Sequence, residues 1–490
     1  MHPYALLAVS LIGLHQTPAG AQLHIRLTTP VGSYASKEGA VVSGVLIAPV
    51  ETATGEVLLP EGSTLKGSVK QVKRVGFGIK HETATLELQF QEVTLPTGVS
   101  LPLSSRLYDV DNGRERVSAE GSILGVRSTS SISYRVSGYI RTLLAWEIHA
   151  RLALWAVKML LVQVPEPEIY YSPGAELTLA LTEPVTSMAW PESNAPLTAE
   201  DQVQLRSIVA EMPYRTTSAK SRPSDLVNMI FVGTRDQITD AFTAAGWTQA
   251  SPSNFRARFV GVRAVAEGLG YQTAPMSKLR LNDAPPDMSW QKGLNDVAKR
   301  HHVRIWKQSE TWDGRELWVG AATRDVDYAY LRPGSTFTHR IEQDIDLERD
   351  KIAYDLQFTS CTNLVDWWDR PGAPTEAHNA TGDPMSTDGR LAVIRLNDCS
   401  SPRVLENADA PPLREHGNYF ERLLRREILS VRSDFYRTNT YWRTYEGARW
   451  LVTAIKHRNH SPAANPAEIQ PSGTVAGSLR SRVLNSSWLR

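Results

Sequence analysis

The alternation of apolar and polar residues in the first part of the chain limits its fold more than any other feature. In the segment 85–93, three apolar residues alternate with Glu87 and Gln89, which is the period of a strand that buries one face. Similar short runs follow one another from Gln22 to about Val185, separated by turns that are rich in glycine, proline and threonine. The pattern predicts an all-β barrel or sandwich over residues 22–185.

One segment inside this β-rich region has a different period. Residues 137–164 carry Leu144, Ile148, Leu152 and Trp155 near helical spacing, so the segment is predicted to be an inserted amphipathic helix. Such a helix usually packs on its own domain, and contact with a membrane surface is the alternative interpretation.

The pattern changes after a polar stretch at 186–223, which we interpret as a linker. A buried strand is predicted from Asn228 to Gly233, and Thr234 to Gln237 has the spacing of a capping box that begins a helix. Residues 224–400 therefore predict an α+β domain with a mixed sheet. A helical region at 401–460, containing a long C-terminal helix, and a flexible tail at 461–490 are expected to follow.

Further elements of the second domain are predicted from the same patterns. A hairpin is expected at 301–307 and 316–322, joined across Asp313 and Gly314. The remaining predictions are helices at 237–245, 255–269, 290–300 and 344–359, and a strand at 390–396.

The beginning of the chain has the pattern of an export signal. Residues 5–14 form an apolar core, and Ala19, Gly20 and Ala21 supply the small residues that signal peptidase needs, so residues 1–21 are predicted to be removed before Gln22. No Lys or Arg precedes the apolar core, which leaves an uncleaved anchor as an alternative. After this segment no run of ~20 uninterrupted apolar residues predicts a transmembrane helix. The predicted location is the periplasm or cell envelope.

Charge and cysteine content agree with that location. The chain has 53 basic and 52 acidic residues, a net charge of +1, which argues against a dedicated nucleic-acid-binding protein. Its only cysteines are Cys361 and Cys399, which are predicted to form a disulfide in an oxidising compartment. Two buried free thiols are the alternative. The expected partners are other envelope proteins or lipid headgroups, and the oligomeric state is not predicted.

Histidine and charged residues of the second domain form the best candidate site, although no motif identifies a catalytic residue or a reaction. An anion or ligand pocket is predicted from four residues, His302, Arg304, Arg324 and His339. A second hypothesis is a divalent metal such as zinc, held by His302, His339, Asp325 and Asp346 and used to activate water for hydrolysis. A structural polar network is the third interpretation, because acidic residues such as Asp346 are also favoured in the first turn of a helix.

Parts of the first domain are similar to a known family. The matching segments are Leu-Leu-Pro-Glu-Gly-Ser-Thr-Leu-Lys-Gly at 58–67, Leu-Pro-Thr-Gly at 95–98 and Glu-Ile-Tyr-Tyr-Ser-Pro-Gly-Ala-Glu-Leu at 168–177. They resemble the β-domain of the TrbI-like conjugal-transfer scaffold family, whose members scaffold envelope-spanning channels. The resemblance implies a β-domain and an envelope location, and it carries over no catalytic residues.

The second domain resembles another family over residues 220–400. The matching segments are 228–236, 244–247, 299–306, 317–325 and 338–346, which together are similar to the LssY C-terminal domain family. Relatives occur with lipid-phosphatase-like membrane domains and in secretion loci, which implies an envelope role. Phosphatase activity is not implied, because the chain lacks the membrane-embedded phosphatase part. The hypothesis is therefore an exported, envelope-associated binding or scaffolding protein, with a metal-dependent hydrolase of a phosphoester or lipid-related substrate as the alternative.

Overall fold

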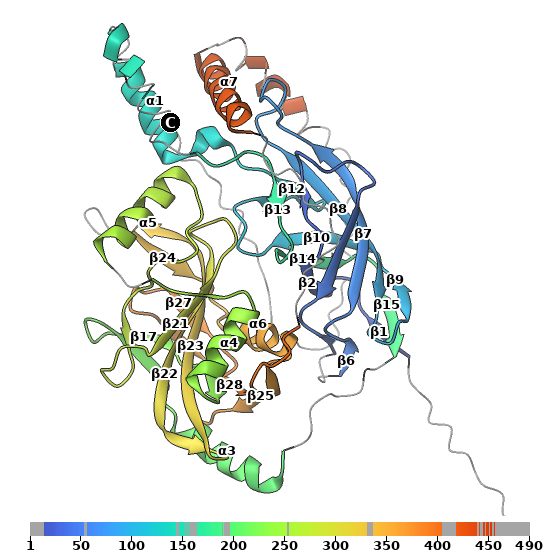
Figure 1. Cartoon of the computed structure of the whole chain (residues 1–490), viewed down its shortest axis with the longest axis vertical. Helices are drawn as coiled ribbons and strands as arrows, with labels where there is room; N and C mark the ends of the chain where they lie inside the picture. Colours follow the sequence, from blue (N-terminus) through green and yellow to red (C-terminus); the bar gives the residue numbers. More distant parts are fainter. Residues whose placement is uncertain are drawn as a thin grey trace, which may run out of the picture. The chain divides into compact units, whose positions relative to one another are not determined.

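The computed structural model describes most of the chain (Figure 1). The described residues are 14–52, 56–143, 147–150, 152–153, 156, 164–188, 190, 197–251, 254–330, 337–403, 418–438, 441, 444–445, 447–449, 451–452 and 455. Residues up to Ser430 belong to one compact unit, and a second unit begins at Val431. The predicted tail at 461–490 lies outside the described residues, and so do the first thirteen residues of the predicted signal peptide.

The β-rich region forms an antiparallel sheet that is nearly closed into a barrel, as predicted. We call it the β-module. Its strands are ordered β10-β14-β2-β4-β7-β8-β12-β11, with β9 paired to β8. The backbone N–H of Leu103 donates to Gln91 O, which links the start of β10 to β8. The bounds are β2 Gln22–Leu27, β4 Val41–Leu46, β7 Thr64–Lys73, β8 Thr85–Thr94, β9 Ser100–Pro102, β10 Ser105–Val110, β11 Arg116–Val117, β12 Ser122–Leu124 and β14 Glu176–Leu181.

The alternation in β8 has the predicted consequence. Leu86, Leu88 and Phe90 are buried in the barrel core, whereas the residues between them are partly exposed. At the bulge between β7 and β8, Gly67 is required because a Cβ atom there would clash with the backbone of Gln89. The alternating pattern of β8 and a glycine at the bulge of β7 together allow these two strands to pair closely.

Short strand pairs complete the β-module. They are β1 Leu14–Thr17 with β15 Val185–Met188, β3 Val31–Gly32 with β13 Tyr170–Tyr171, and β5 Val50–Glu51 with β6 Val57–Leu59. The inserted helix begins earlier than predicted: α1 spans Ile132–Leu143, after the short 3-10 helix η1 at Ser128–Ser130. Much of the predicted segment beyond α1, including Trp155, lies outside the described residues. Among the described helices, none is both long enough and apolar enough to cross a bilayer.

The second part of the compact unit is an α+β domain with a mixed sheet, as predicted. We call it the α+β module. The sheet order is β19-β21-β22-β23-β18-β28-β25, with β24 paired to β23, and only the β18–β28 pair is parallel. The bounds are β18 Met229–Val232, β19 Thr248–Gln249, β21 Met288–Lys292, β22 Arg300–Trp312, β23 Arg315–Tyr330, β24 Phe337–Ile341, β25 Thr362–Asp369 and β28 Arg390–Leu396. Small sheets add β16 Arg215–Ser218, β17 Pro223–Leu226, β20 Leu279–Arg280, β26 Glu376–His378 and β27 Pro384–Ser386.

Helices cover both faces of this sheet. On one face, α4 (Arg235–Ala244) and α6 (Asp346–Phe358) bury Phe242 and Leu356 against strand residues such as Phe231. On the other face, α3 (Ala199–Glu211) buries Leu205. Helix α5 (Phe255–Glu267) lies next to α1. The predicted capping box is present, since the Thr234 side chain accepts from Gln237 N and the Gln237 side chain accepts from Thr234 N.

One helix prediction is wrong. The segment 290–300 was expected to be helical, but Trp290 and Gln291 belong to β21, which pairs with β22. The aromatic ring of Trp290 stacks on Phe242 of α4 at a centroid distance of 5.3 Å. Tertiary packing on the sheet therefore overrides the local helical spacing.

The long C-terminal helix is present as α7, Tyr419–Thr438. Its apolar stripe is not the face that docks: Phe420 and Leu424 are 76% and 52% exposed, whereas Arg425 and Leu429 are each 2% exposed. The Arg425 side chain donates to Gly76 O and pairs with Glu166. A charged contact and one leucine thus hold the first turns of the helix to the β-module.

The two cysteines lie side by side at disulfide distance, with Cα atoms 4.4 Å apart. Cys361 precedes β25 and Cys399 follows β28, and these two strands are neighbours in the sheet. The closed loop therefore contains the small β26–β27 sheet and Asp388.

Candidate functional site

Two predicted residues of the α+β module meet at a single carboxylate. His302 of β22 places Nε2 2.9 Å from Asp325 Oδ1, and His339 of β24 places Nδ1 3.4 Å from Asp325 Oδ2. Strand pairing explains the convergence, because β22, β23 and β24 are consecutive in the sheet. Asp325 lies on β23, between the two histidines. We call these three residues the His302 cluster.

Neighbouring groups complete the surroundings of Asp325. Arg300 Nη2 lies 3.3 Å from Asp325 Oδ2, and the Arg300 side chain also donates to Gln291 Oε1 at 3.0 Å. Thr323 Oγ1 lies 3.2 Å from His302 Nδ1. A proton on His302 Nε2 would point to the carboxylate and leave Nδ1 to accept from the threonine hydroxyl. His302 is thereby oriented from both sides.

The electrostatics keep the carboxyl group ionised. Burial would raise the pKa of Asp325, but His302, His339 and Arg300 together lower it well below its ordinary value. Burial lowers the pKa of His339, and the opposing attraction of Asp325 does not offset this shift. The His339 side chain is 31% exposed, so the cluster is open to the surface at that residue.

The other predicted ligand-binding residues lie elsewhere. Arg304 is buried on the same face of β22 as His302, but it contacts Asp225 at 3.3 Å and Ser277. Arg324 faces the β-module, where it lies 3.0 Å from Asp111 and donates to Asn112. Only His302 and His339 of the four predicted ligand-binding residues therefore share a partner.

Asp346 is also apart from the His302 cluster. Its carboxylate accepts from the Thr387 hydroxyl at 2.7 Å and from the Asp388 backbone N–H at 2.6 Å, and it lies 3.0 Å from Arg349. It is at the start of α6, where acidic residues are favoured. Within the described ranges, no group of three or more His, Cys, Asp or Glu side chains is arranged to hold a metal ion.

Residues that are not among the predicted site residues meet where the two modules contact each other. His301, next to His302 but on the opposite face of β22, lies 2.7 Å from Asp111 of the β-module and 2.5 Å from Glu348 of α6. Burial would lower the pKa of His301, but the two carboxylates raise it to about 9. The alternation of the strand separates His301 from His302, but no local signal connects His301 with a carboxylate 190 residues earlier.

A second set of charges continues this junction. Arg26 and Glu176 of the β-module meet Lys292, Lys351 and Asp355 of the α+β module. Lys292 Nζ lies 2.6 Å from Glu176 and 2.9 Å from Asp355, and Lys351 Nζ lies 2.7 Å from each of the same two carboxylates. The Arg26 guanidinium lies 2.7 Å from Glu176 and 3.3 Å from Asp355. We call these five residues and the Asp111–His301–Glu348 group the charged junction.

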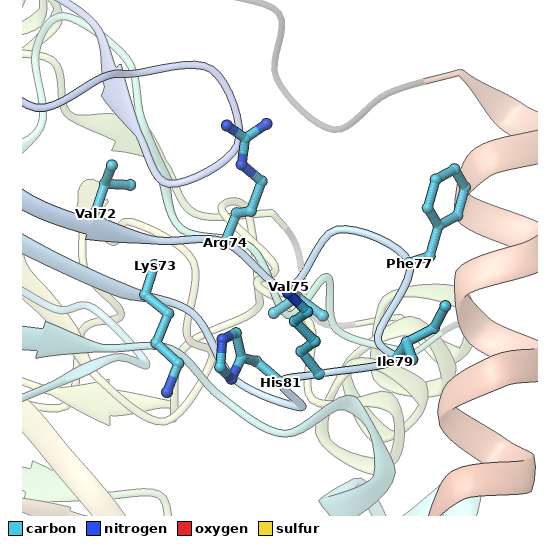
Figure 2. Close-up of a pocket in the computed structure, with 8 residues that line it drawn as sticks. Val72, Lys73, Arg74, Val75, Phe77, Ile79 and His81 are labelled. Atoms are coloured by element: carbon cyan, nitrogen blue, oxygen red, sulfur yellow. The ribbon is translucent and has the colours of Figure 1, made fainter.

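A hollow that is rich in basic side chains lies at the end of the β7–β8 hairpin. It has a volume of about 450 Å³ and is lined by residues of β7 and the following turn, among them Lys73, Arg74, Lys80 and His81 (Figure 2). Phe77 and Ile79 in the same turn are 49% and 71% exposed. None of the predicted site residues contributes to this hollow.

The observed class is a two-module protein, with a nearly closed antiparallel barrel followed by a mixed α+β sheet. Residues 209–391 match the family model described as LssY C-terminus. This match covers the core of the α+β module, including the His302 cluster and all five residues that this module contributes to the charged junction.

Comparison of the chain with solved structures and with curated proteins finds little sequence similarity. The solved structure of ComB10 of the Com type IV secretion system of Helicobacter pylori is matched at 12% identity and a TM-score of 0.20. That match covers 35% of this chain and 89% of the ComB10 chain. No curated protein matches the sequence significantly. The description of the β-module therefore depends on its own strand pairing.

Proposed function

We propose that this protein is an exported component of the bacterial cell envelope that binds or scaffolds other envelope components. Its β-module would act as a frame for the LssY C-terminus-like α+β module. The apolar segment at residues 5–14, the cysteine pair at disulfide distance and the family match support this proposal. Its partners would be envelope proteins or lipid headgroups, at the periplasmic side of a membrane.

The observation that carries the proposal is the charged junction. Glu176 and Asp355 come from different modules, and their carboxylates share the cations of Arg26, Lys292 and Lys351. Removing one partner of such a buried group typically costs about 3–5 kcal/mol, because the remaining charges lose their compensation. Separating the modules would expose the same groups from both sides. The two modules are therefore expected to act as one body, which suits a scaffold better than a pair of independently moving domains.

Cell fractionation tests the location. The full chain, tagged at its C-terminus, should appear in the periplasmic or membrane fraction, with Cys361 and Cys399 protected from alkylation until a reductant is added. Leu11→Arg, which interrupts the apolar leader, should retain the protein in the cytosol. Recovery from the cytosol of the chain without the Leu11 substitution, with both thiols reduced, would refute the proposal.

The N-terminus of the exported protein supplies a second result. Cleavage after Ala21 would remove β1, whose residues Leu14 to Thr17 pair with β15 and whose Thr17 is fully buried. N-terminal sequencing separates a mature chain that begins at Gln22 from an uncleaved anchor that keeps this strand pair.

A metal-dependent hydrolase is the second candidate function. Its starting point is the convergence of His302 and His339 on Asp325, where the imidazoles contact the carboxylate itself and, within the described residues, do not form a group arranged to hold a metal ion. Two imidazoles and a carboxylate are ligands that zinc accepts. Asp346, the fourth residue of that hypothesis, belongs to the Arg349 group instead.

A further inference from the structure

A wide cleft lies between the two modules of the compact unit, away from the His302 cluster. Its volume is about 1340 Å³, which is above the range of about 300–1,000 Å³ that is typical of small-molecule pockets. One wall comes from the β5–β6 hairpin of the β-module, and the opposite wall from α3, α6 and β25. Six consecutive residues, 364–369, line it, because β25 is the last strand of its sheet.

Aromatic rings are fixed in this wall. The indole N–H of Trp367 donates to Asp350 Oδ1 at 2.7 Å, and the indole N–H of Trp368 donates to Asp366 Oδ2 at 2.9 Å. Tyr354 packs against Trp367 at a centroid distance of 5.4 Å. The polar atoms of both indoles are already bonded within the protein.

The two rings lie on opposite faces of this edge strand, Trp367 partly against the core that contains Phe242 and Trp368 partly against the core that contains Leu205. Each ring is half-buried, and the surface that it leaves for a ligand is apolar. The faces of aromatic rings carry partial negative charge and attract the positively polarised C–H edges of a partner.

The backbone edge of β25 is partly blocked. Trp367 N–H donates to the side chain of its neighbour, Asp366 Oδ1, at 2.9 Å. Ala392 is the residue opposite Trp367 on β28, and its N–H donates to Asn228 O, away from β25. Opposite residues of an antiparallel pair direct their N–H groups either both inward or both outward, so the Trp367 N–H points to the free edge of the sheet. A carboxylate already occupies this donor, which disfavours the addition of an extended peptide as a further strand.

Polar groups surround the rings with nearly balanced charge. The lining contains four carboxylates and three guanidinium groups, together with the amides of Gln202 and Gln357. One carboxylate oxygen of Glu61 is buried and accepts no hydrogen bond from the described part of the chain. Burial raises the pKa of Glu61 to about 7, although Arg403 opposes this shift. A ligand that fits this wall must bring hydrogen-bond donors and little net charge.

These requirements select among ligand classes. A polyanion or a lipid phosphate would meet more carboxylates than guanidinium groups. A proline-rich segment could stack on the rings, but proline has no N–H to offer the carboxylates. A sugar ring has an apolar C–H face and a hydroxyl-bearing edge that both donates and accepts. The volume accommodates more than one such ring.

We propose that the cleft between the β5–β6 hairpin and β25 binds a neutral saccharide chain, stacked on the aromatic rings and hydrogen-bonded by the carboxylate, guanidinium and amide groups. This proposal rests on the proposed envelope function, and it names the ligand class that the protein would hold there.

Titration of the full-length protein tests the proposal. The probes are N-acetylchitotetraose, cellotetraose and maltotetraose. Their binding is measured by tryptophan fluorescence and by calorimetry. At least one should bind with a Kd below about 1 mM and change the fluorescence. Glu61→Gln and Arg206→Ala leave the aromatic rings in place and should each weaken binding by about tenfold. Trp368→Ala should abolish it, provided that thermal unfolding shows the variant to be folded.

Matched controls give the result its meaning. Tyr108→Ala removes a half-exposed aromatic ring that does not line the cleft, and it should leave binding unchanged. Absence of binding by all probes at about 10 mM would overturn the proposal, as would binding that Glu61→Gln and Arg206→Ala do not affect. Binding of decaproline in place of the sugars, weakened by the same variants, would assign the cleft to a peptide. Because the titration uses purified protein, its failure leaves the fractionation result intact, and a cytosolic location would refute the envelope function alone.

Discussion

The charged junction and the His302 cluster are built from neighbouring residues and have different consequences. His301 and His302 are consecutive on β22, but His301 bridges carboxylates of both modules, whereas His302 contacts only residues of the α+β module. The side chains of the junction are at most 16% exposed, while the His302 cluster opens to the surface at His339, which is 31% exposed. The difference teaches that one strand can supply a structural ion network on one face and an accessible polar site on the other, since its side chains alternate.

Breaking the junction should have the largest effect on stability. Asp355→Ala would leave the cations of Arg26, Lys292 and Lys351 with Glu176 as their remaining carboxylate among these five residues. It would also remove the acceptor of the Trp247 indole N–H. We expect the free energy of unfolding to fall by about 3–5 kcal/mol, measured by urea denaturation.

An exposed ion pair is the control for that change. Lys307 and Glu316 form an ion pair whose side chains are 47% and 37% exposed, so Glu316→Ala should lower stability by less than about 1 kcal/mol. An equal loss in the two variants would show that the junction does not contribute more than a surface pair. The comparison between the two regions would then fail.

How well the sequence predicts a contact in these regions depends on how far apart in the sequence the two contacting residues are. The period of residues 85–93 and the capping box at Thr234 are local signals, and β8 and α4 formed where they indicated. The contact of His302 with Asp325 follows from the hairpin at Asp313 and Gly314, which aligns β22 with β23. Local patterns failed at Trp290, where packing on Phe242 outweighs helical spacing.

The junction could not be predicted in this way. Arg26 meets Asp355 across 329 residues, and the pairing depends on how the two modules pack against each other. Alternation shows that His301 and His302 face opposite sides, but it does not show which side meets the other module. Likewise, Arg304 shares a face of β22 with His302 but pairs with Asp225, and Arg324 pairs with Asp111 of the β-module. Strand alternation alone identifies neither of these partners.

The titration of His301 should have an intermediate effect. Its pKa in the folded protein is raised to about 9 from an ordinary value of 6.5, by Asp111 and Glu348 against the effect of burial. A raised pKa stabilises the fold fully below pH 6.5, and this contribution is lost as the pH rises through about 9. We expect up to about 3 kcal/mol of stability to disappear over this interval. Urea denaturation at several pH values measures the slope.

Two substitutions of adjacent residues sharpen that result. His301→Gln keeps hydrogen-bonding capacity without the titrating charge, so its stability should be lower at pH 6 and nearly independent of pH up to 9. His302→Gln should retain the slope of the unsubstituted protein, because His302 contacts Asp325 and Thr323, whereas Asp111 and Glu348 pair with His301. A slope that survives in His301→Gln would assign the titration to another group.

The smallest effect is expected at His339, and it bears on the hydrolase hypothesis. Because the side chain is partly exposed and lies 3.4 Å from Asp325, His339→Ala should change stability by less than about 1 kcal/mol. Under the binding and scaffolding proposal, elemental analysis of the purified full chain should find no stoichiometric divalent metal, and His339→Ala should not impair the protein in cells. One zinc ion per chain, lost in both His302→Ala and His339→Ala but kept in Asp346→Asn, would instead establish a metal site at Asp325. That outcome would make the accessible face of β22 a reaction centre while leaving the buried face as the structural junction.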